Sequence, residues 1–161
     1  MDRVSKVPTL SSKDLFDLDL VRVRIAQSAG EQAKVGELLR DLFTRDPANA
    51  EVLLELAKHY DALAKNESDD AKRITQLGEA KSHFKLAVEK PAVAYQANLG
   101  LGQLLVREKQ YVEGLPYLER ALALKPGDKA SLEQYLSRVK RAADREIQRK
   151  EREAKERAEA K

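Results

Sequence analysis

Three proline-containing breaks divide the chain and set the spacing of the elements it can form. Pro47, Pro91 and Pro126 each remove a backbone N–H and disfavour the α conformation in the preceding residue. Pro91 and Pro126 lie 35 residues apart, and Pro47 and Pro91 lie 44 apart. A period near 34 residues is typical of arrays of helix–turn–helix units. The breaks therefore predict an all-α fold built from successive helical hairpins.

The composition agrees with long helices and argues against several other classes of protein. Of the 161 residues, 42 % are hydrophobic and 35 % are charged, with only seven glycines and five prolines. No run of about 18 apolar residues occurs, so no membrane span is expected. Residues 1–13 lack the apolar stretch of a signal peptide. Cysteine is absent, which excludes disulfides and thiolate zinc sites. A cytoplasmic protein is expected.

The segment 95–128 carries the most specific pattern in the chain. It contains a leucine–glycine pair, an aromatic residue at a turn, a small–large–small series and a closing proline: Leu101, Gly102, Tyr111, Gly114, Leu118, Ala121 and Pro126. This pattern resembles one repeat of the tetratricopeptide family. Small residues at these positions let two helices approach closely while leucines fill the space between them. Asn98 stands where the family usually has a large aromatic residue, which predicts looser packing there.

The same register finds apolar stripes in the neighbouring segments. The residues expected to face the core are Val35, Leu39, Leu42, Leu53, Leu56, Ala57, Tyr60, Ala80, Phe84, Ala87, Leu132, Tyr135, Leu136 and Val139. The resemblance implies a tetratricopeptide-type array, or α-solenoid, of about three repeats and a capping helix. The expected boundaries are a flexible N-terminus at 1–11, an array at 12–142 with a divergent repeat at 12–47, an extended repeat at 50–91, a third repeat at 95–128 and a cap at 129–142, then a charged, projecting helical tail at 143–161.

The first helix of the first repeat has two interpretations. Residues 18–25 alternate between apolar and polar side chains like a strand. Leu15, Leu18 and Ile25 also fit one face of a helix. An isolated strand would leave its backbone groups unpaired, so the repeat context favours a helix with a capping signal at Ser12.

The second repeat is about ten residues longer than the family length, with the excess around residues 65–75. We expect its first helix to reach about Lys65 and its second helix to start near Asp69, with Ser68 as the N-cap. Three apolar residues should pack on one another in this extension: Leu63, Ile74 and Leu77. The tip must stand clear of the shorter neighbours. It is either a second contact site or an inert length variant.

Motifs for catalysis or cofactor binding are missing. His59 and His83 have no metal-ligand spacing and are expected on helix surfaces. Gly100 and Gly102 lack the third glycine and preceding strand of a nucleotide loop, so they are assigned to packing. The sequence predicts no catalytic, cofactor-binding or metal-ligating residue, and an enzyme is not expected.

The resemblance implies that the first helices of the repeats line a concave groove for a peptide or helix of a partner protein. The implied groove residues are Glu51, Leu54, Glu55, Lys58, Asp61, Ala62, Gln96, Leu99, Gly100, Gln103, Val106 and Arg107, with Glu133, Gln134, Ser137, Lys140 and Arg141 on the capping helix. Leu54, Leu99 and Val106 are expected to form an exposed apolar floor. Glu55 would oppose a carboxylate, which argues against the family members that bind C-terminal carboxylates.

The alternative hypothesis is a self-assembling structural adaptor that uses the array ends or the charged tail. Under this hypothesis the partner is a second copy of the chain, in a homo-oligomer. Residues 138–161 carry ten Lys/Arg and six Asp/Glu, which accounts for the net charge of +3 of the whole chain. The tail has favourable pairs four residues apart: Glu146 with Lys150, Glu151 with Lys155 and Glu153 with Arg157. These pairs predict a solvated helix. The interleaved acids and the lack of aromatic residues argue against a nucleic-acid partner.

Overall fold

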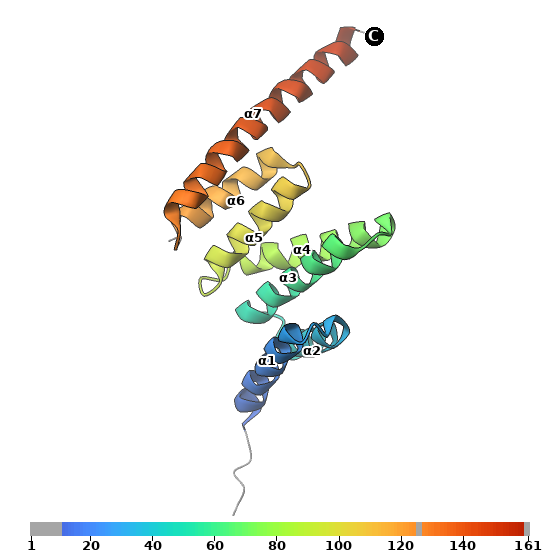
Figure 1. The fold of residues 1–161 in the computed structure, drawn as a ribbon, viewed down its shortest axis with the longest axis vertical. Helices are drawn as coiled ribbons and strands as arrows, with labels where there is room; N and C mark the ends of the chain where they lie inside the picture. Colours follow the sequence, from blue (N-terminus) through green and yellow to red (C-terminus); the bar gives the residue numbers. More distant parts are fainter. Residues whose placement is uncertain (1–10, 125–126, 160–161) are drawn as a thin grey trace, which may run out of the picture.

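The computed structural model describes residues 11–124 and 127–159, which form seven helices and no β-strand (Figure 1). The helices are α1 (Ser12–Ser28), α2 (Gln32–Arg45), α3 (Ala50–Asn66), α4 (Asp70–Ala87), α5 (Ala94–Arg107), α6 (Tyr111–Ala123) and α7 (Lys129–Glu159). The all-α prediction is confirmed. Pro47 and Pro91 fall between helices as expected. Pro126 and residues 1–10 of the expected flexible N-terminus lie outside the described residues.

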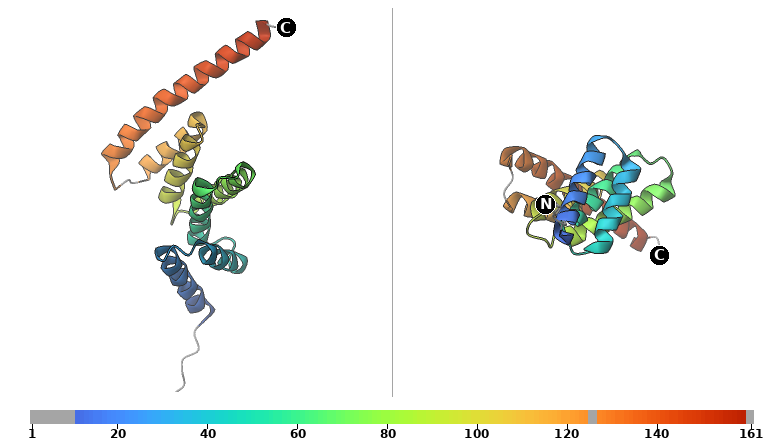
Figure 2. Two further views of the ribbon diagram at one scale, coloured as in Figure 1. Left: turned by 45° about the vertical axis from the view of Figure 1, so that its right-hand side comes forward. Right: turned by 90° about the horizontal axis from the view of Figure 1, so that it is seen from below.

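The helices pack as sequential pairs. α1 packs on α2, α3 on α4 and α5 on α6, and α7 packs on α6. α3 also contacts α5, so the first helices of the second and third hairpins are neighbours. Figures 1 and 2 show the hairpins stacked along the long axis, with α1 and α7 at opposite ends. The cap and the tail expected at 129–142 and 143–161 belong to one continuous helix as far as residue 159.

Three apolar clusters hold the stack together, and each includes stripes predicted from the sequence. One joins α1, α2 and α3 and includes Val35, Leu39 and Leu42. A second joins α3, α4 and α5 around Phe84. A third joins α6 and α7 around Leu118. Every residue of the stripes predicted between residues 35 and 139 is buried except two tyrosines, Tyr60 and Tyr135, which are half-buried in or beside their clusters.

Close contact between α5 and α6 depends on small residues. A Cβ atom added at Gly102 would lie 2.6 Å from Cγ of Leu118, and one at Gly114 would lie 3.1 Å from the carbonyl oxygen of Gly102. Asn98 is buried beside this contact, where its side-chain amide donates to the carbonyl of Ala94 at 2.8 Å. Its Oδ1 atom has no hydrogen-bond partner among the described residues. The close approach therefore occurs at the glycines that the sequence pattern singled out.

The first segment is a helix, so the strand alternative at residues 18–25 is wrong. The prediction of which face of this helix packs against the core is also wrong. Its N-cap is Ser11 rather than Ser12, and Asp14 completes a capping box with Ser11. Leu20, Val23 and Ala26 are buried toward α2. The residues assigned to the inner face are exposed instead: Leu15, Leu18 and Ile25. Both faces of this helix are apolar, so the periodicity alone could not choose between them.

The extended hairpin is helical close to its tip, with helix ends within one residue of the expected positions. Asp69, not Ser68, is the N-cap of α4; its carboxylate accepts from the backbone N–H of Lys72 at 2.9 Å. Leu77 is buried with Ala64, and Leu63 is half-buried. The side chain of Ile74 is 64 % exposed, so its predicted packing is wrong. By helical spacing it lies outside the buried stripe of α4, on the side next to Leu77.

The two histidines are not surface residues, which corrects the sequence prediction. His59 is buried, and His83 is half-buried between Phe43 and Tyr60. The ring of His83 stacks on Tyr60 at a centroid distance of 5.8 Å and meets the edge of Phe43 at 5.4 Å. Burial lowers the pKa of both histidines, because a charged imidazolium is poorly solvated there. Arg40 lowers the pKa of His59 further, whereas Glu79 opposes the shift at His83.

Acidification is therefore expected to destabilise the fold in the range where histidine titrates. The pKa of His59 and His83 lies below the ordinary value of 6.5 in the folded chain, so the unfolded chain binds protons first as the pH falls. The contribution of the two neutral histidines to the free energy of unfolding is fully present above pH 6.5. It is lost as the pH falls through their folded-state pKa values. Thermal denaturation between about pH 8 and pH 5 measures this loss. The variant His59→Gln should show a weaker pH dependence, and identical pH profiles for variant and wild type would contradict the prediction.

Candidate functional site

A continuous groove runs between α3 and α5, the neighbouring first helices of two hairpins. It consists of two hollows of about 420 and 350 Å³ that share Lys58 and Gln96. The first hollow is lined by Asn49, Ala50, Glu51, Leu54, Glu55, Lys58, Ala92, Val93 and Gln96. The second is lined by Lys58, Asp61, Lys65, Phe84, Gln96, Leu99, Gly100, Gln103 and Arg107. Consecutive hairpins thus form one groove with lining side chains from α3, α4, α5 and the turn before α5.

The structure brings most of the implied groove residues together. Of the α3 and α5 positions, Val106 and Ala62 do not line the groove. The capping-helix positions do not line it either: Glu133, Gln134, Ser137, Lys140 and Arg141. The prediction that three apolar residues form an exposed floor of the groove is wrong. Leu54 is buried in the cluster around Phe84, while Leu99 and Val106 are half-buried against the cluster of α6 and α7.

The floor of the second hollow is formed at a glycine over an aromatic ring. A Cβ atom added at Gly100 would lie 2.6 Å from Cε1 of Phe84, so the missing side chain leaves the α5 backbone directly against the ring. Phe84 was predicted as core but not as part of the groove. Its position could not be read from the sequence, because it comes from α4 and reaches the groove from beneath. The base of the second hollow is therefore the α5 backbone at Gly100 packed on the ring of Phe84.

Acidic side chains on the α3 wall already have polar partners. Glu51 forms an ion pair with Arg24 of α1, and Glu55 accepts from Nε2 of Gln27 at 2.8 Å. The Nζ atom of Lys58 lies 2.7 Å from the second carboxylate oxygen of Glu55. These contacts join α1 to α3 and neutralise the acidic end of the groove. The first hairpin thus stabilises the wall without lining the hollows itself.

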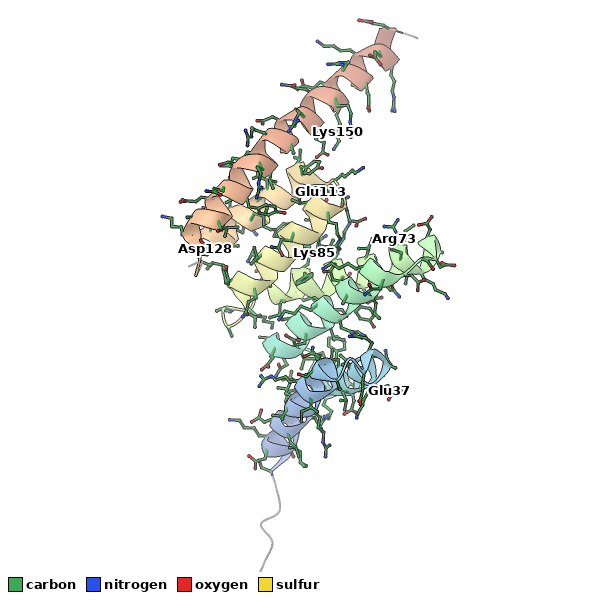
Figure 3. The ribbon with its side chains drawn as sticks, viewed as in Figure 1. Glu37, Arg73, Lys85, Glu113, Asp128 and Lys150 are labelled. Carbon is green, nitrogen blue, oxygen red and sulfur yellow. The ribbon has the colours of Figure 1, made fainter. Side chains whose placement is uncertain are left out.

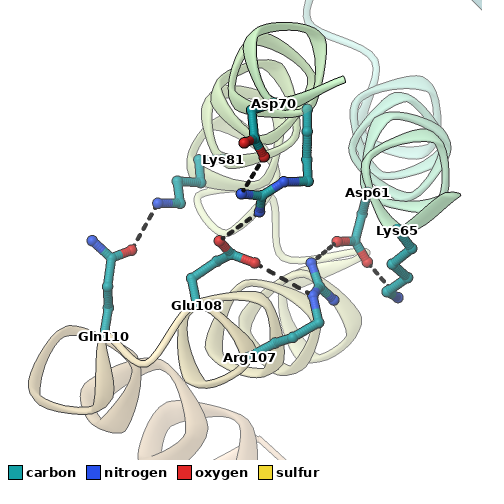
Figure 4. Close-up of polar contacts among 8 residues, drawn as sticks. Asp61, Lys65, Asp70, Lys81, Arg107, Glu108 and Gln110 are labelled. Carbon is teal, nitrogen blue, oxygen red and sulfur yellow. Dashed lines mark hydrogen bonds and ion pairs between the residues drawn. The ribbon is translucent and has the colours of Figure 1, made fainter. Parts of the chain in front are cut away.

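A second polar network joins the far end of the groove to the extended hairpin (Figure 4). Asp61 forms an ion pair with Arg107 of α5 and a second one with Lys65 at 2.7 Å. Glu108 lies 3.7 Å from Arg107 and 3.5 Å from Arg73 of α4. Figure 3 shows Arg73 near the tip of that hairpin, which projects beside the stack. The ion pair between Arg73 and Glu108 therefore joins the tip of the extended hairpin to the C-terminal end of α5. The tip does not stand wholly clear of the neighbouring hairpin, as had been expected.

The last helix carries a feature that counting its charges did not reveal. Five of its six arginines recur three or four residues apart and so share one face: Arg138, Arg141, Arg145, Arg149 and Arg152. Glu146 lines a hollow together with Arg145 and Arg149 and accepts from the backbone N–H of Val112 at 3.1 Å, in the first turn of α6. Lys150 holds the pKa of Glu146 below its usual range. Figure 3 shows the side chains beyond Lys150 extending away from the stack.

Neither comparison with known proteins gave a match: no family model fits the chain, and no curated protein is similar to it. In residues 11–124 and 127–159, no helix has the length and apolar character needed to cross a membrane. Within the same residues, no group of three His, Asp or Glu side chains is placed to hold a metal ion. In the part of the chain that the structure describes, the protein is all-helical, with seven helices packed as sequential pairs and a groove between two neighbouring hairpins.

Proposed function

We propose that this chain is a protein-interaction module of the tetratricopeptide type that binds a peptide or helix of a partner between α3 and α5. The observation that carries the proposal is the groove shared by two consecutive hairpins. Its lining includes the positions that the resemblance assigns to ligand binding: Glu51, Leu54, Glu55, Lys58, Gln96, Leu99, Gln103 and Arg107. The proposal assigns no catalytic role to any residue.

The polar groups of the groove suit an extended peptide that carries acidic side chains. Gln96 and Gln103 are exposed seven residues apart, hence on the same face of α5, and each amide can both donate to and accept from a peptide backbone. Lys58 and Lys65 are about half exposed, whereas Asp61 keeps only 13 % of its side-chain surface because its cationic partners cover it. A ligand would therefore meet the two amides and the two ammonium groups, together with the carboxylate of Glu51, whose side chain is 40 % exposed.

Selection of a phage-displayed library of random peptides on the purified chain tests the proposal. The selected peptides would be labelled, and their affinity measured by fluorescence anisotropy for wild type and for the double variant Gln96→Ala and Gln103→Ala. We expect the dissociation constant to rise at least tenfold, which corresponds to about 1.4 kcal/mol. Both residues are exposed, so circular dichroism should show an unchanged helix content.

The matched control is Gln148→Ala, which removes an exposed glutamine from α7 far from the groove. This variant should bind the selected peptides like wild type. Salt should weaken the binding of acidic peptides, since screening reduces their attraction to Lys58 and Lys65. Selected peptides that bind the double variant and wild type equally would show that the groove is not the binding site.

A further inference from the structure

The outward face of α1 is an apolar stripe at one end of the stack. Leu15, Leu18, Val21 and Ile25 are 45, 41, 44 and 63 % exposed. They make up four of the nine exposed large hydrophobic residues in the described part of the chain. The opposite face of α1 is buried on α2, so the helix is apolar on both sides. An apolar stripe of this kind on a helix surface is typical of an interaction site.

The stripe has the spacing of a helix–helix contact. Leu15, Leu18 and Ile25 follow one another at three and seven residues, and Val21 fills the gap between Leu18 and Ile25. Such residues form an apolar seam along a helix, which Arg22 interrupts between Leu18 and Ile25. α1 lies at one end of the stack, and Figures 1 and 2 show no other described helix over its outer side. The exposed fractions of the four side chains agree with this position.

The charges beside the stripe make it complementary to itself in one orientation. Asp14 and Asp17 lie in the N-terminal half of α1, and Arg22 and Arg24 lie in the C-terminal half. Parallel pairing of two such helices would place like charges together. Antiparallel pairing about a two-fold axis near residue 20 places Asp17 beside Arg24 of the second copy, on the same flank of the seam. The same axis places Leu15 opposite Ile25 of the second copy.

We propose that two copies of this chain associate through α1, in antiparallel orientation, along the Leu15, Leu18, Val21 and Ile25 stripe. The occupant is a second copy because both the apolar positions and the charges match under the two-fold axis of an isologous contact. Arg24 remains 63 % exposed while it pairs with Glu51, so its guanidinium can also meet Asp17 of the second copy. The contact uses the outer side of α1 and not the residues that line the groove between α3 and α5. The proposed dimer therefore has two grooves, one in each copy.

Sedimentation velocity of the full 161-residue chain over a hundredfold range of concentration tests the association. The mass should rise from 18.1 kDa toward twice that value as the concentration increases. Ile25→Glu should abolish the rise without loss of helix content, because the side chain is largely exposed. Ile74→Glu is the matched control, since Ile74 is 64 % exposed on α4 and should leave the association unchanged. A monomer at every concentration, or an Ile25→Glu variant that still dimerises, would overturn the proposal.

Charge exchange tests the orientation. Asp17→Arg alone and Arg24→Asp alone should each dimerise at least tenfold more weakly, because each places like charges across the two-fold axis. An equimolar mixture of the two variants should dimerise again, because every pair then has opposite charges. A mixture no stronger than its components would overturn the antiparallel arrangement. Peptide affinity does not enter these measurements, so the outcome is independent of the groove.

Discussion

Leu118→Ala is expected to destabilise the chain by about 2–5 kcal/mol, because it removes a fully buried leucine from the contact between the last two hairpin helices. The side chain lies directly against the backbone of α5 at Gly102, so the surrounding helices cannot close the cavity without shifting. Urea denaturation followed by circular dichroism gives the free energy of unfolding for wild type and variant. Leu124→Ala is the control, since that side chain is 46 % exposed just after the same helix. It should change the stability by about 0.5 kcal/mol or less.

The partner of Leu118 gives a sharper form of the same test. Gly102→Ala places a methyl group 2.6 Å from Cγ of Leu118 and should cost about 1–3 kcal/mol through overpacking. In the Leu118→Ala background this clash is gone, and the nearest atom that remains is the backbone nitrogen of residue 118, at 3.2 Å. The two changes should therefore cost less together than their sum. Gly78→Ala, with open space around it, should be neutral or stabilising by about 0.5–1 kcal/mol. Additive costs would show that the helices do not meet at Gly102.

The hairpin architecture could be predicted because its signals are local. A proline break needs only the residue before it, and a buried stripe such as Val35, Leu39 and Leu42 repeats within one helix. The face of α1 could not be predicted, because the choice between two apolar faces depends on where α2 lies. The same holds for His59, which is polar by type but is covered by the α2 helix near Gly36.

The groove could be placed on the sequence, but its chemistry could not. The repeat register assigns Asp61 and Arg107 to successive groove positions of two repeats without indicating that they meet. Their ion pair joins residues 46 positions apart and depends on the offset between neighbouring hairpins. Leu54 is a second example. It was expected on the surface of the groove, but it is buried in the core because of the offset between neighbouring hairpins. The spacing of residues within a helix predicts which side chains share a face. Whether that face is buried, exposed or paired depends on contacts between hairpins.

Phe84→Ala is expected to cost about 3–5 kcal/mol, the largest effect of any single truncation considered. Phe84 is the largest fully buried side chain of the described residues, and it lies where the second hairpin meets the third. Leu118, in contrast, lies against Gly102 within the third hairpin. In a stack in which each hairpin contacts mainly its neighbours, stability is the sum of hairpin terms and interface terms. The loss at Phe84 therefore falls on the interface and should uncouple α1–α4 from α5–α7.

Hydrogen exchange of the native chain distinguishes uncoupling from a uniform loss of stability. In wild type, amides of α3 and α5 should exchange with similar protection, because both helices open together. In Phe84→Ala the protection of α5 should fall well below that of α3. The control is Leu86→Ala on the same helix, where the side chain is 51 % exposed and the change should be about 0.5 kcal/mol or less. Equal loss of protection in α3 and α5 would mean that the stack unfolds as one unit. The groove would then depend on the stability of the whole chain rather than on one interface, because its two walls are these same helices.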